Sequence, residues 1–416
     1  EDRWIGTRTR DPDELESLRR ALADGMPQRV EAPGVVHSYS NYGANLGGHL
    51  VEEVSSLSYD QFVEENILQP LGMHGTTFRQ PIPEALAANL ATGYSRKGGE
   101  LQAAPLAYAV MAPASAVAVT PIDMAAFMIA HLHDGEYGNN RVLEQATIQE
   151  MHRQQFTHHP DMPGMTYGFK ERFINGLRII GHGGDIHTFA SQMVLIPEED
   201  LGLFVVYNRF DDAFREQLIS AFFDHYYPAP IQDAMPQALE VPLESLKRFT
   251  GRYRWVKYPR STLGKAIAMV PGPYPIVVEA NEDASLSLSF FGAKAEWRYV
   301  PVEPLVLKRV AGGPQLLDGL QVDPGDTLAF RENEAGEIAY GLVPLQNVAF
   351  EKLAWYEYPE VQLGTLGTLL LLFVSAVVLL PLGALIGRLR KRSRGGRPGS
   401  RLGLWVGWVV SALNLV

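Results

Sequence analysis

Two short segments, far apart in the sequence, carry side chains suited to acyl-transfer chemistry. Residues 39–41 read Tyr-Ser-Asn, so a phenol and a carboxamide lie two positions apart and can point the same way from extended backbone. Such a pair can activate a hydroxyl nucleophile and orient a carbonyl group. Residues 182–184 read His-Gly-Gly, and glycines let backbone approach a ligand closely. We therefore take Tyr39, Asn41 and His182 as candidate catalytic residues.

The surrounding pattern predicts the elements that hold these residues. A helix is expected immediately after Asn41, because Leu46, Leu50, Val54 and Leu57 recur at helical spacing and predict a buried stripe. A second helix is expected at Pro121, where Thr120 is a suitable N-cap. Near residue 178 the period changes to that of strands. Three strands are expected at 178–181, 189–196 and 201–207, the last two joined by a turn at 197–200. Helices followed by a hairpin favour an α+β fold, a mainly antiparallel sheet with flanking helices.

The rest of the chain predicts separate parts. The first domain is expected at 1–228, and the proline-rich stretch 229–245 is expected to be a linker. Short alternating runs separated by glycine, proline and acidic turns predict a small all-β barrel or sandwich at 246–358.

The C-terminal segment predicts a membrane anchor. Residues 363–387 include an uncharged run longer than the roughly 20 residues a helix needs to cross a bilayer. The arginine-rich segment 388–401 is expected to be a cytoplasmic loop, and 402–416 the start of a second transmembrane helix. The lipid bilayer is therefore an expected partner, at a bacterial cell membrane with the preceding domains outside the cytoplasm. An exported domain needs a targeting signal, but the chain has no initiator Met and no signal peptide, and the apolar run 402–416 is too short to cross a bilayer; both ends are therefore expected to be truncated.

Composition excludes several classes. The formal net charge is −11, which argues against nucleic acid as a partner because phosphate binding requires a concentrated basic surface. The chain has no cysteine, which excludes disulfides, thiolate metal sites and cysteine nucleophiles.

Several stretches in this order resemble the serine β-lactamase and penicillin-binding-protein superfamily, most closely its class C branch with D-aminopeptidases and related esterases. The resemblance covers roughly residues 1–225. It rests on the stretches at 33–55, 67–78, 112–128, 166–169 and 181–208.

The resemblance implies a site built from three motifs: Ser-x-x-Lys, Tyr-x-Asn, and Lys-Thr-Gly or His-x-Gly on an edge strand. It makes Tyr39 the general base and Asn41 a residue that positions substrate. It places His182, Gly183 and Gly184 on the acyl-binding strand, with the N–H of Asp185 in the oxyanion hole. A neutral imidazole is a weaker anchor for an acidic β-lactam than lysine, which favours peptides or esters. No cofactor is implied and no metal site is expected.

The Ser-x-x-Lys motif is absent from the chain. None of the nine lysines has a serine three positions earlier, and we treat Thr262-x-x-Lys265 as a chance match outside any helix start. We expect the nucleophile to lie before Glu1. The predicted function is a membrane-anchored serine hydrolase that forms an acyl-enzyme on a peptide, ester or β-lactam-like carbonyl. A small-molecule or peptide substrate, including cell-wall peptide, is the expected partner.

Alternatives remain open. The family could include this chain as a catalytically inactive, membrane-tethered binder of peptidoglycan-like peptides or of a regulatory partner, or as a domain that gates a membrane bundle. Ser40 has no base spaced to activate it. A metallohydrolase would need either the cluster at 131–134 or His182 with Asp185 and His187.

Overall fold

The computed structural model describes most of the 416-residue chain. The described residues are 7–186, 188–229, 236–258, 260, 276–290, 297–317, 320–345 and 348–389.

A four-stranded antiparallel sheet forms the centre of the first domain, in the order β10-β9-β8-β7. Its strands are β7 (Lys170–Ile174), β8 (Leu177–Ile186), β9 (Phe189–Ile196) and β10 (Leu201–Tyr207). The predicted hairpin is confirmed, because Leu201 pairs with Ile196 across a turn in which Asp200 adopts φ 48°. The expected α+β class with a mainly antiparallel sheet is also confirmed.

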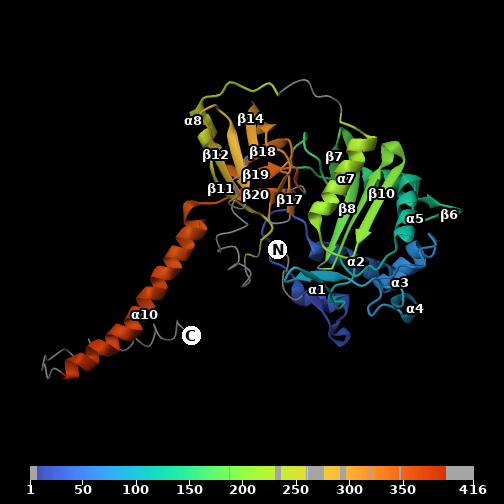
Figure 1. Cartoon of the computed structure of the whole chain (residues 1–416), viewed down its shortest axis with the longest axis horizontal. Helices are drawn as coiled ribbons and strands as arrows, with labels where there is room; N and C mark the ends of the chain where they lie inside the picture. Colours follow the sequence, from blue (N-terminus) through green and yellow to red (C-terminus); the bar gives the residue numbers. More distant parts are fainter. Residues whose placement is uncertain are drawn as a thin grey trace. The chain divides into compact units, whose positions relative to one another are not determined.

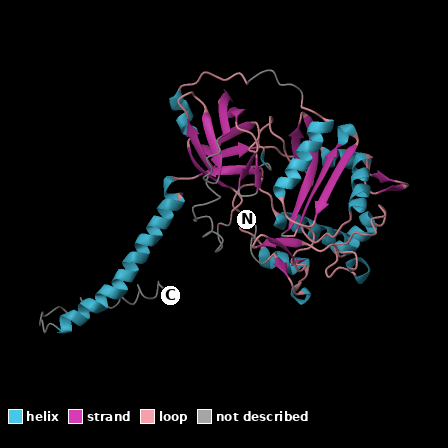
Figure 2. Ribbon diagram, viewed as in Figure 1, coloured by secondary structure: helices cyan, strands magenta, loops and turns pink. Residues whose placement is uncertain are grey.

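Helices cover both faces of this sheet (Figure 1; Figure 2). Neighbouring strand residues point to opposite faces, so Ile180 and Leu195 contact α5 (Pro121–Leu132), while Ile179 and Val194 contact α7 (Asp212–Tyr226). Helix α5 begins as predicted, with Thr120 Oγ1 accepting the N–H of Asp123 at 3.2 Å. These two apolar layers fix β8, which carries residues 182–184.

Helix α2 (Asn41–Ser55) begins at Asn41 as predicted, but the prediction of a buried leucine stripe is wrong. Leu46, Leu50 and Val54 are 41%, 58% and 87% exposed. The buried face instead carries Asn45 and Gly48. Helical spacing shows which residues share a face, but it does not show which face another element covers.

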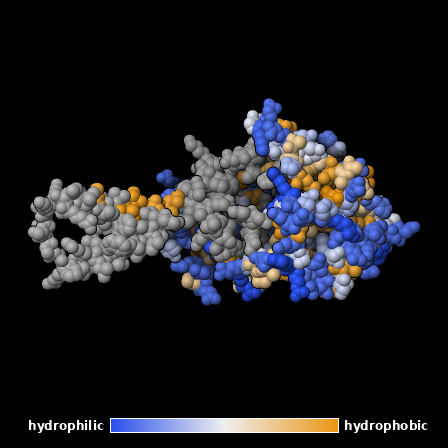
Figure 3. All heavy atoms as spheres, turned by 90° about the horizontal axis from the view of Figure 1, so that it is seen from below, coloured by the Kyte–Doolittle hydropathy of each residue, from blue (hydrophilic) through white to orange (hydrophobic). Residues whose placement is uncertain are grey.

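The remaining elements of the first domain are short and surround the sheet. They are β1 (Arg8–Thr9), η1 (Pro12–Glu14), α1 (Leu18–Gly25), α3 (Tyr59–Val63), η2 (Glu64–Leu68), α4 (Glu84–Ala87), β2 (Tyr94–Lys97), β3 (Glu100–Ala103), β4 (Tyr108–Ala109), β5 (Glu136–Tyr137), β6 (Asn140–Arg141), α6 (Gln145–His152) and η3 (Pro197–Glu199). On the face seen in Figure 3, hydrophilic side chains predominate among the described residues, and apolar ones form separate smaller areas.

The expected all-β module is a closed barrel, entered through α8 (Leu243–Leu246) and η4 (Lys247–Phe249). Helix α8 begins inside the segment predicted as a linker. Buried aromatic side chains fill the interior, including Tyr253, Trp297 and Tyr299. In ladder order the strands are β11 (Gly251–Trp255), β12 (Ile276–Ala280), β13 (Leu286–Phe290), β14 (Trp297–Glu303), β15 (Val306–Ala311), β18 (Thr327–Glu332), β19 (Ile338–Val343) and β20 (Val348–Lys352). A separate pair comprises β16 (Gln315–Leu317) and β17 (Leu320–Val322).

The barrel contacts the chain segment that leads to Tyr39. Arg331 on β18 donates from Nη1 to the carbonyl of Val35 and from Nη2 to the carbonyl of His158 at 3.1 Å. Next to these bonds, Met162 and Val36 pack against barrel residues such as Val306. The barrel is therefore joined to the backbone only a few residues before Tyr39.

A long helix, α10 (Pro359–Leu389), follows the short turn η6 (Trp355–Glu357) and covers the predicted apolar run. The transmembrane prediction for 363–387 is nevertheless not confirmed: within the described part of the chain, no helix has the length and apolar character needed to cross a membrane. An uncharged run favours a helix, but that alone does not establish a membrane span. The predicted basic loop at 388–401 lies outside the described residues from position 390, as does all of 402–416.

Candidate active site

Tyr39 and Asn41 come together at the start of α2. The Tyr39 hydroxyl donates to Asn41 Oδ1 at 3.0 Å, across Ser40, which is extended at φ −139° and ψ 115°. The Ser40 Oγ accepts the N–H of Gly43 at 3.0 Å and so serves as the helix N-cap. This local geometry agrees with the sequence-based expectation that both polar groups point the same way. It also gives Ser40 a structural role.

The structure brings His182 to the same place. The ring centroids of Tyr39 and His182 are 5.9 Å apart. Nδ1 of His182 lies 2.6 Å from the carbonyl oxygen of Gly183 and must carry the proton, because a carbonyl only accepts. The Nε2 lone pair is therefore available to a substrate donor.

The pKa of His182 is lowered, first by burial and then by the nearby Lys170 ammonium. The imidazole is consequently neutral at neutral pH.

Strand β8 presents one unpaired edge beside these residues. Its ladder with β7 ends at the Lys170–Gly181 pair, whereas its ladder with β9 continues to Ile186. In the described residues no strand pairs with 182–186 on the β7 side. Gly183 and Gly184 follow His182 there, so extended substrate backbone could add to this edge.

Asp185, the predicted oxyanion donor, also lies on this edge and is exposed. Its carboxylate pairs with Arg215 of α7 at 2.5 Å, which ties β8 to the helix behind it. A Cβ on Gly184 would lie 2.7 Å from Ser191 Oγ, so glycine allows the close approach of β9.

Two further residues at the site were missed by sequence reasoning: Lys170 and Lys257. Their Nζ atoms lie 5.1 Å and 4.6 Å from the Tyr39 ring centroid. Lys170 directly follows the stretch 166–169 used for the resemblance, which was a weak signal. Lys257 belongs to the barrel, and no local pattern relates it to Tyr39.

The metal alternative has little support. His131 Nδ1 contacts His152 Nε2 at 3.2 Å, while His133 pairs with Asp200 at 3.4 Å, so the two do not converge. His187, which the second alternative requires, lies outside the described residues. No cluster of three potential ligands occurs in the part of the chain that the structure describes.

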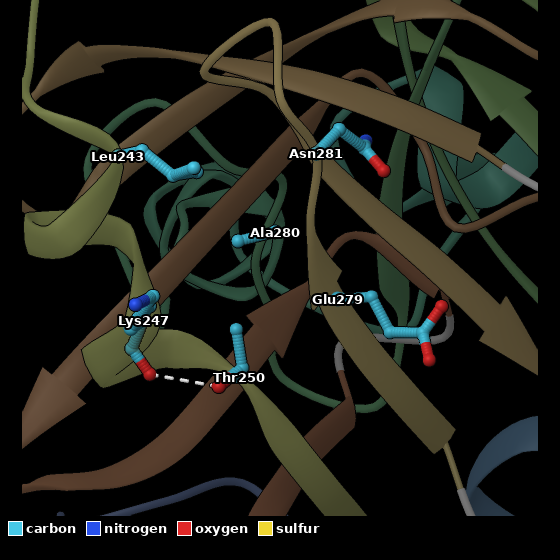
Figure 4. A pocket seen from close by; sticks show the side chains of 6 residues that line it. All are labelled: Leu243, Lys247, Thr250, Glu279, Ala280 and Asn281. Carbon is cyan, nitrogen blue, oxygen red and sulfur yellow. Dashed lines mark hydrogen bonds between the residues drawn. The ribbon is translucent and has the colours of Figure 1, made fainter.

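A surface pocket on the barrel is a separate feature (Figure 4). It is lined by Leu243, Lys247, Thr250, Glu279, Ala280 and Asn281. The Thr250 hydroxyl donates to the carbonyl of Lys247 at 2.8 Å, and the Lys247 ammonium pairs with Glu244 at 2.6 Å. None of these residues is among those described around Tyr39. The pocket is therefore a different feature from the candidate active site.

Comparison with known proteins gives a family, curated relatives and similar solved structures. The family model described as Beta-lactamase matches residues 4–222. The chain is 29% identical over 190 residues to the D-alanyl-D-alanine-carboxypeptidase/endopeptidase AmpH of Escherichia coli (strain K12), covering 43% of this chain and 46% of AmpH. It is 25% identical over 181 residues to Protein flp of Staphylococcus aureus (strain MW2), covering 42% of this chain and 34% of flp.

Both matches span less than half of the relative's own length. The solved structure of the octameric penicillin-binding protein homologue from Pyrococcus abyssi aligns over 84% of this chain and 72% of that chain. Its sequence identity is 20% and its TM-score is 0.45.

Proposed function

The chain belongs to the beta-lactamase family, and from that premise we propose that it is part of a serine hydrolase that cleaves a peptide next to a D-amino acid through an acyl-enzyme. The observation that carries the proposal is the grouping of Tyr39, Asn41 and His182 beside the unpaired edge of β8. This edge suits extended peptide backbone. The name of the relative AmpH, a D-alanyl-D-alanine carboxypeptidase, supports the peptide class.

In the proposed reaction, a serine oxygen bonds to the substrate carbonyl carbon and the C–N bond breaks. Tyr39, acting as its phenolate, accepts the serine proton and delivers it to the leaving nitrogen, so that a neutral amine departs and the phenolate is restored. Water then cleaves the ester and returns a proton to the serine. Asn41 holds the Tyr39 hydroxyl, and the backbone of 183–185 faces the carbonyl oxygen.

The serine is not one of the residues described at the site. The chain contains no Ser-x-x-Lys, and Ser40 is occupied as a helix cap. That the nucleophile lies in a segment preceding Glu1 stays a prediction.

The test uses the protein produced from its complete gene. Labelling by a fluorophosphonate or penicillin probe, with release of the C-terminal D-alanine from acetyl-D-alanyl-D-alanine, is expected. A well-folded protein that neither takes the label nor releases D-alanine contradicts the proposal.

The missing motif favours a second candidate, a catalytically inactive family member that binds such peptides. This candidate predicts peptide binding without labelling. A complete gene that lacks any Ser-x-x-Lys codons upstream of Glu1 would favour it.

Location outside the cytoplasm also stays a proposal, since it rests on the arginine-rich segment 388–401. Alkaline phosphatase inserted between Tyr358 and Pro359 of the complete protein, with the following residues retained, should be active if the segment 388–401 lies in the cytoplasm and the preceding domains are exported. An inactive but intact fusion contradicts it.

A further inference from the structure

Two ammonium groups from different parts of the chain converge on the ring of Tyr39. Lys170 Nζ lies 5.1 Å and Lys257 Nζ lies 4.6 Å from the ring centroid. Lys170 is the first residue of β7, beside the point where the edge of β8 becomes unpaired. Lys257 lies in the barrel, just after β11. The barrel therefore contributes a charged group to the candidate active site.

Lys257 is held in place by its neighbours. The N–H of Val256 donates to the carbonyl of Ala349 at 3.1 Å, and Val256 is buried. On the other side, Tyr258 is also buried, and the Arg254 guanidinium lies 3.8 Å from its ring centroid. Because the residues on both sides of Lys257 are anchored in the barrel, the backbone of Lys257 is fixed. The barrel fold therefore determines where the Lys257 side chain starts and that it can reach Tyr39.

Three cationic side chains, those of Lys257, Arg172 and Arg215, disfavour the charged form of Lys170. Asp185, the acidic group whose charge acts on Lys170, is itself paired with Arg215 at 2.5 Å. Burial, and after it the charge of Lys257, lowers the pKa of Lys170 to about 8. The Lys170 cation is therefore desolvated and still mostly charged at neutral pH. A bound anion would relieve both costs.

We propose that Lys170 and Lys257 together bind a free carboxylate on the substrate. This inference rests on the proposed function and narrows it: the preferred substrates would carry a terminal carboxylate on the leaving group, as in a carboxypeptidase reaction. The barrel would then determine which substrates the first domain accepts.

The chemistry of the leaving group agrees with this placement. In a peptide whose last residue is released, the carboxylate carbon lies only about 2.5 Å from the leaving nitrogen, across a single Cα. If Tyr39 protonates that nitrogen, the carboxylate must lie close to the Tyr39 side chain. The two ammonium groups occupy this neighbourhood.

The test is a binding measurement, which needs no acylation step. Calorimetry would compare acetyl-D-alanyl-D-alanine with its C-terminal amide, using protein from the complete gene. The acid is expected to bind at least about tenfold more tightly, equal to about 1.4 kcal/mol. Lys170→Met and Lys257→Met should each remove most of that preference and leave the affinity for the amide unchanged.

Two controls keep the result specific. Lys247→Met removes an exposed barrel ammonium that pairs with Glu244, and it should keep the preference. Lys170→Arg and Lys257→Arg should retain much of it, because they keep the charge. Equal binding of acid and amide by the unaltered protein overturns the inference, and so does a preference that survives both methionine substitutions. Preferential binding without turnover would instead leave this inference standing and contradict the hydrolase proposal.

Discussion

The Tyr39 hydroxyl donates to Asn41 Oδ1 at 3.0 Å across one extended residue, and the centroid of the Tyr39 ring lies 5.9 Å from that of His182, 5.1 Å from Lys170 Nζ and 4.6 Å from Lys257 Nζ. A single phenol is thus in contact with the start of a helix, an edge strand and the barrel. Its substitution should affect chemistry far more than stability.

Tyr39→Phe should lower the rate of probe labelling by roughly 10²- to 10⁴-fold, because it removes the group proposed to transfer the proton. Time courses of fluorophosphonate labelling measure this. Tyr42→Phe is the matched control. The Tyr42 hydroxyl donates to the carbonyl of Leu22 at 3.1 Å, so its loss should cost about 1 kcal/mol of stability and leave labelling intact. If both variants are labelled at similar rates, Tyr39 is not the group that transfers the proton.

Carboxylate binding should weaken as pH rises through about 8. Lys170 is charged below its pKa of about 8 and loses its proton above it, so one of the two cations disappears. The ionisable groups that face it are Tyr39, Arg172, His182, Asp185, Arg215 and Lys257. Affinity for acetyl-D-alanyl-D-alanine should fall from pH 7 to about pH 10, and the Lys170→Arg variant should not show this fall near pH 8. A wild-type affinity that is constant over this range would contradict the prediction.

His131 should make the fold sensitive to acid. Burial, and after it the neighbouring His152, lowers its pKa from 6.5 to about 4. Between these values the unfolded chain takes up a proton that the folded chain does not, so stability is complete above about pH 6.5 and falls as pH drops toward 4. The loss is at most about 3 kcal/mol. Denaturant unfolding of His131→Gln should show a shallower acid slope. The exposed His225→Gln should keep the wild-type slope.

Two adjacent glycines of α2 should respond oppositely to alanine. A Cβ on Gly48 would lie 2.5 Å from Pro113 Cγ, whereas a Cβ on Gly47 meets nothing within 4 Å. Gly48→Ala should therefore lower the free energy of unfolding by about 1–3 kcal/mol. Gly47→Ala should raise it by about 0.5–1 kcal/mol through helix propensity. Chemical denaturation of both variants measures these free energies of unfolding. If the two substitutions change the free energy equally, Gly48 does not pack closely against Pro113.

Arg331→Met should weaken the join between the barrel and the segment before Tyr39. It removes two charge-assisted hydrogen bonds to backbone carbonyls, which should cost about 2 kcal/mol or more. Because Lys257 reaches Tyr39 from the barrel, the preference for acid over amide should fall as well. Arg298→Met, which removes an exposed pair with Asp283, should leave that preference unchanged. An Arg331 variant of normal stability and preference would refute the coupling.

Local patterns predicted much of this fold. The hairpin β9–β10 was predictable because alternating residues flank a turn of four polar or proline residues. The helix start at Asn41 followed from the residues around it. The buried face of α2 was not predictable, because burial depends on Pro113, which arrives from a distant loop.

The candidate site was likewise only partly predictable from the sequence. Motif order predicts Tyr39, Asn41 and His182 as site residues, and the structure places the three close together. Lys257 could not be found, since its position beside Tyr39 depends on how a closed barrel packs against another domain. Contacts of that kind leave no spacing in the sequence.

Arg331 binds main-chain oxygen atoms at Val35 and His158. Every residue type supplies a carbonyl, so the partner at position 35 can change its side chain freely without loss of this bond. These two hydrogen bonds therefore depend on the side chain of Arg331 and not on the side chains at positions 35 and 158. Among natural variants of this chain, we expect position 35 to drift while position 331 stays fixed.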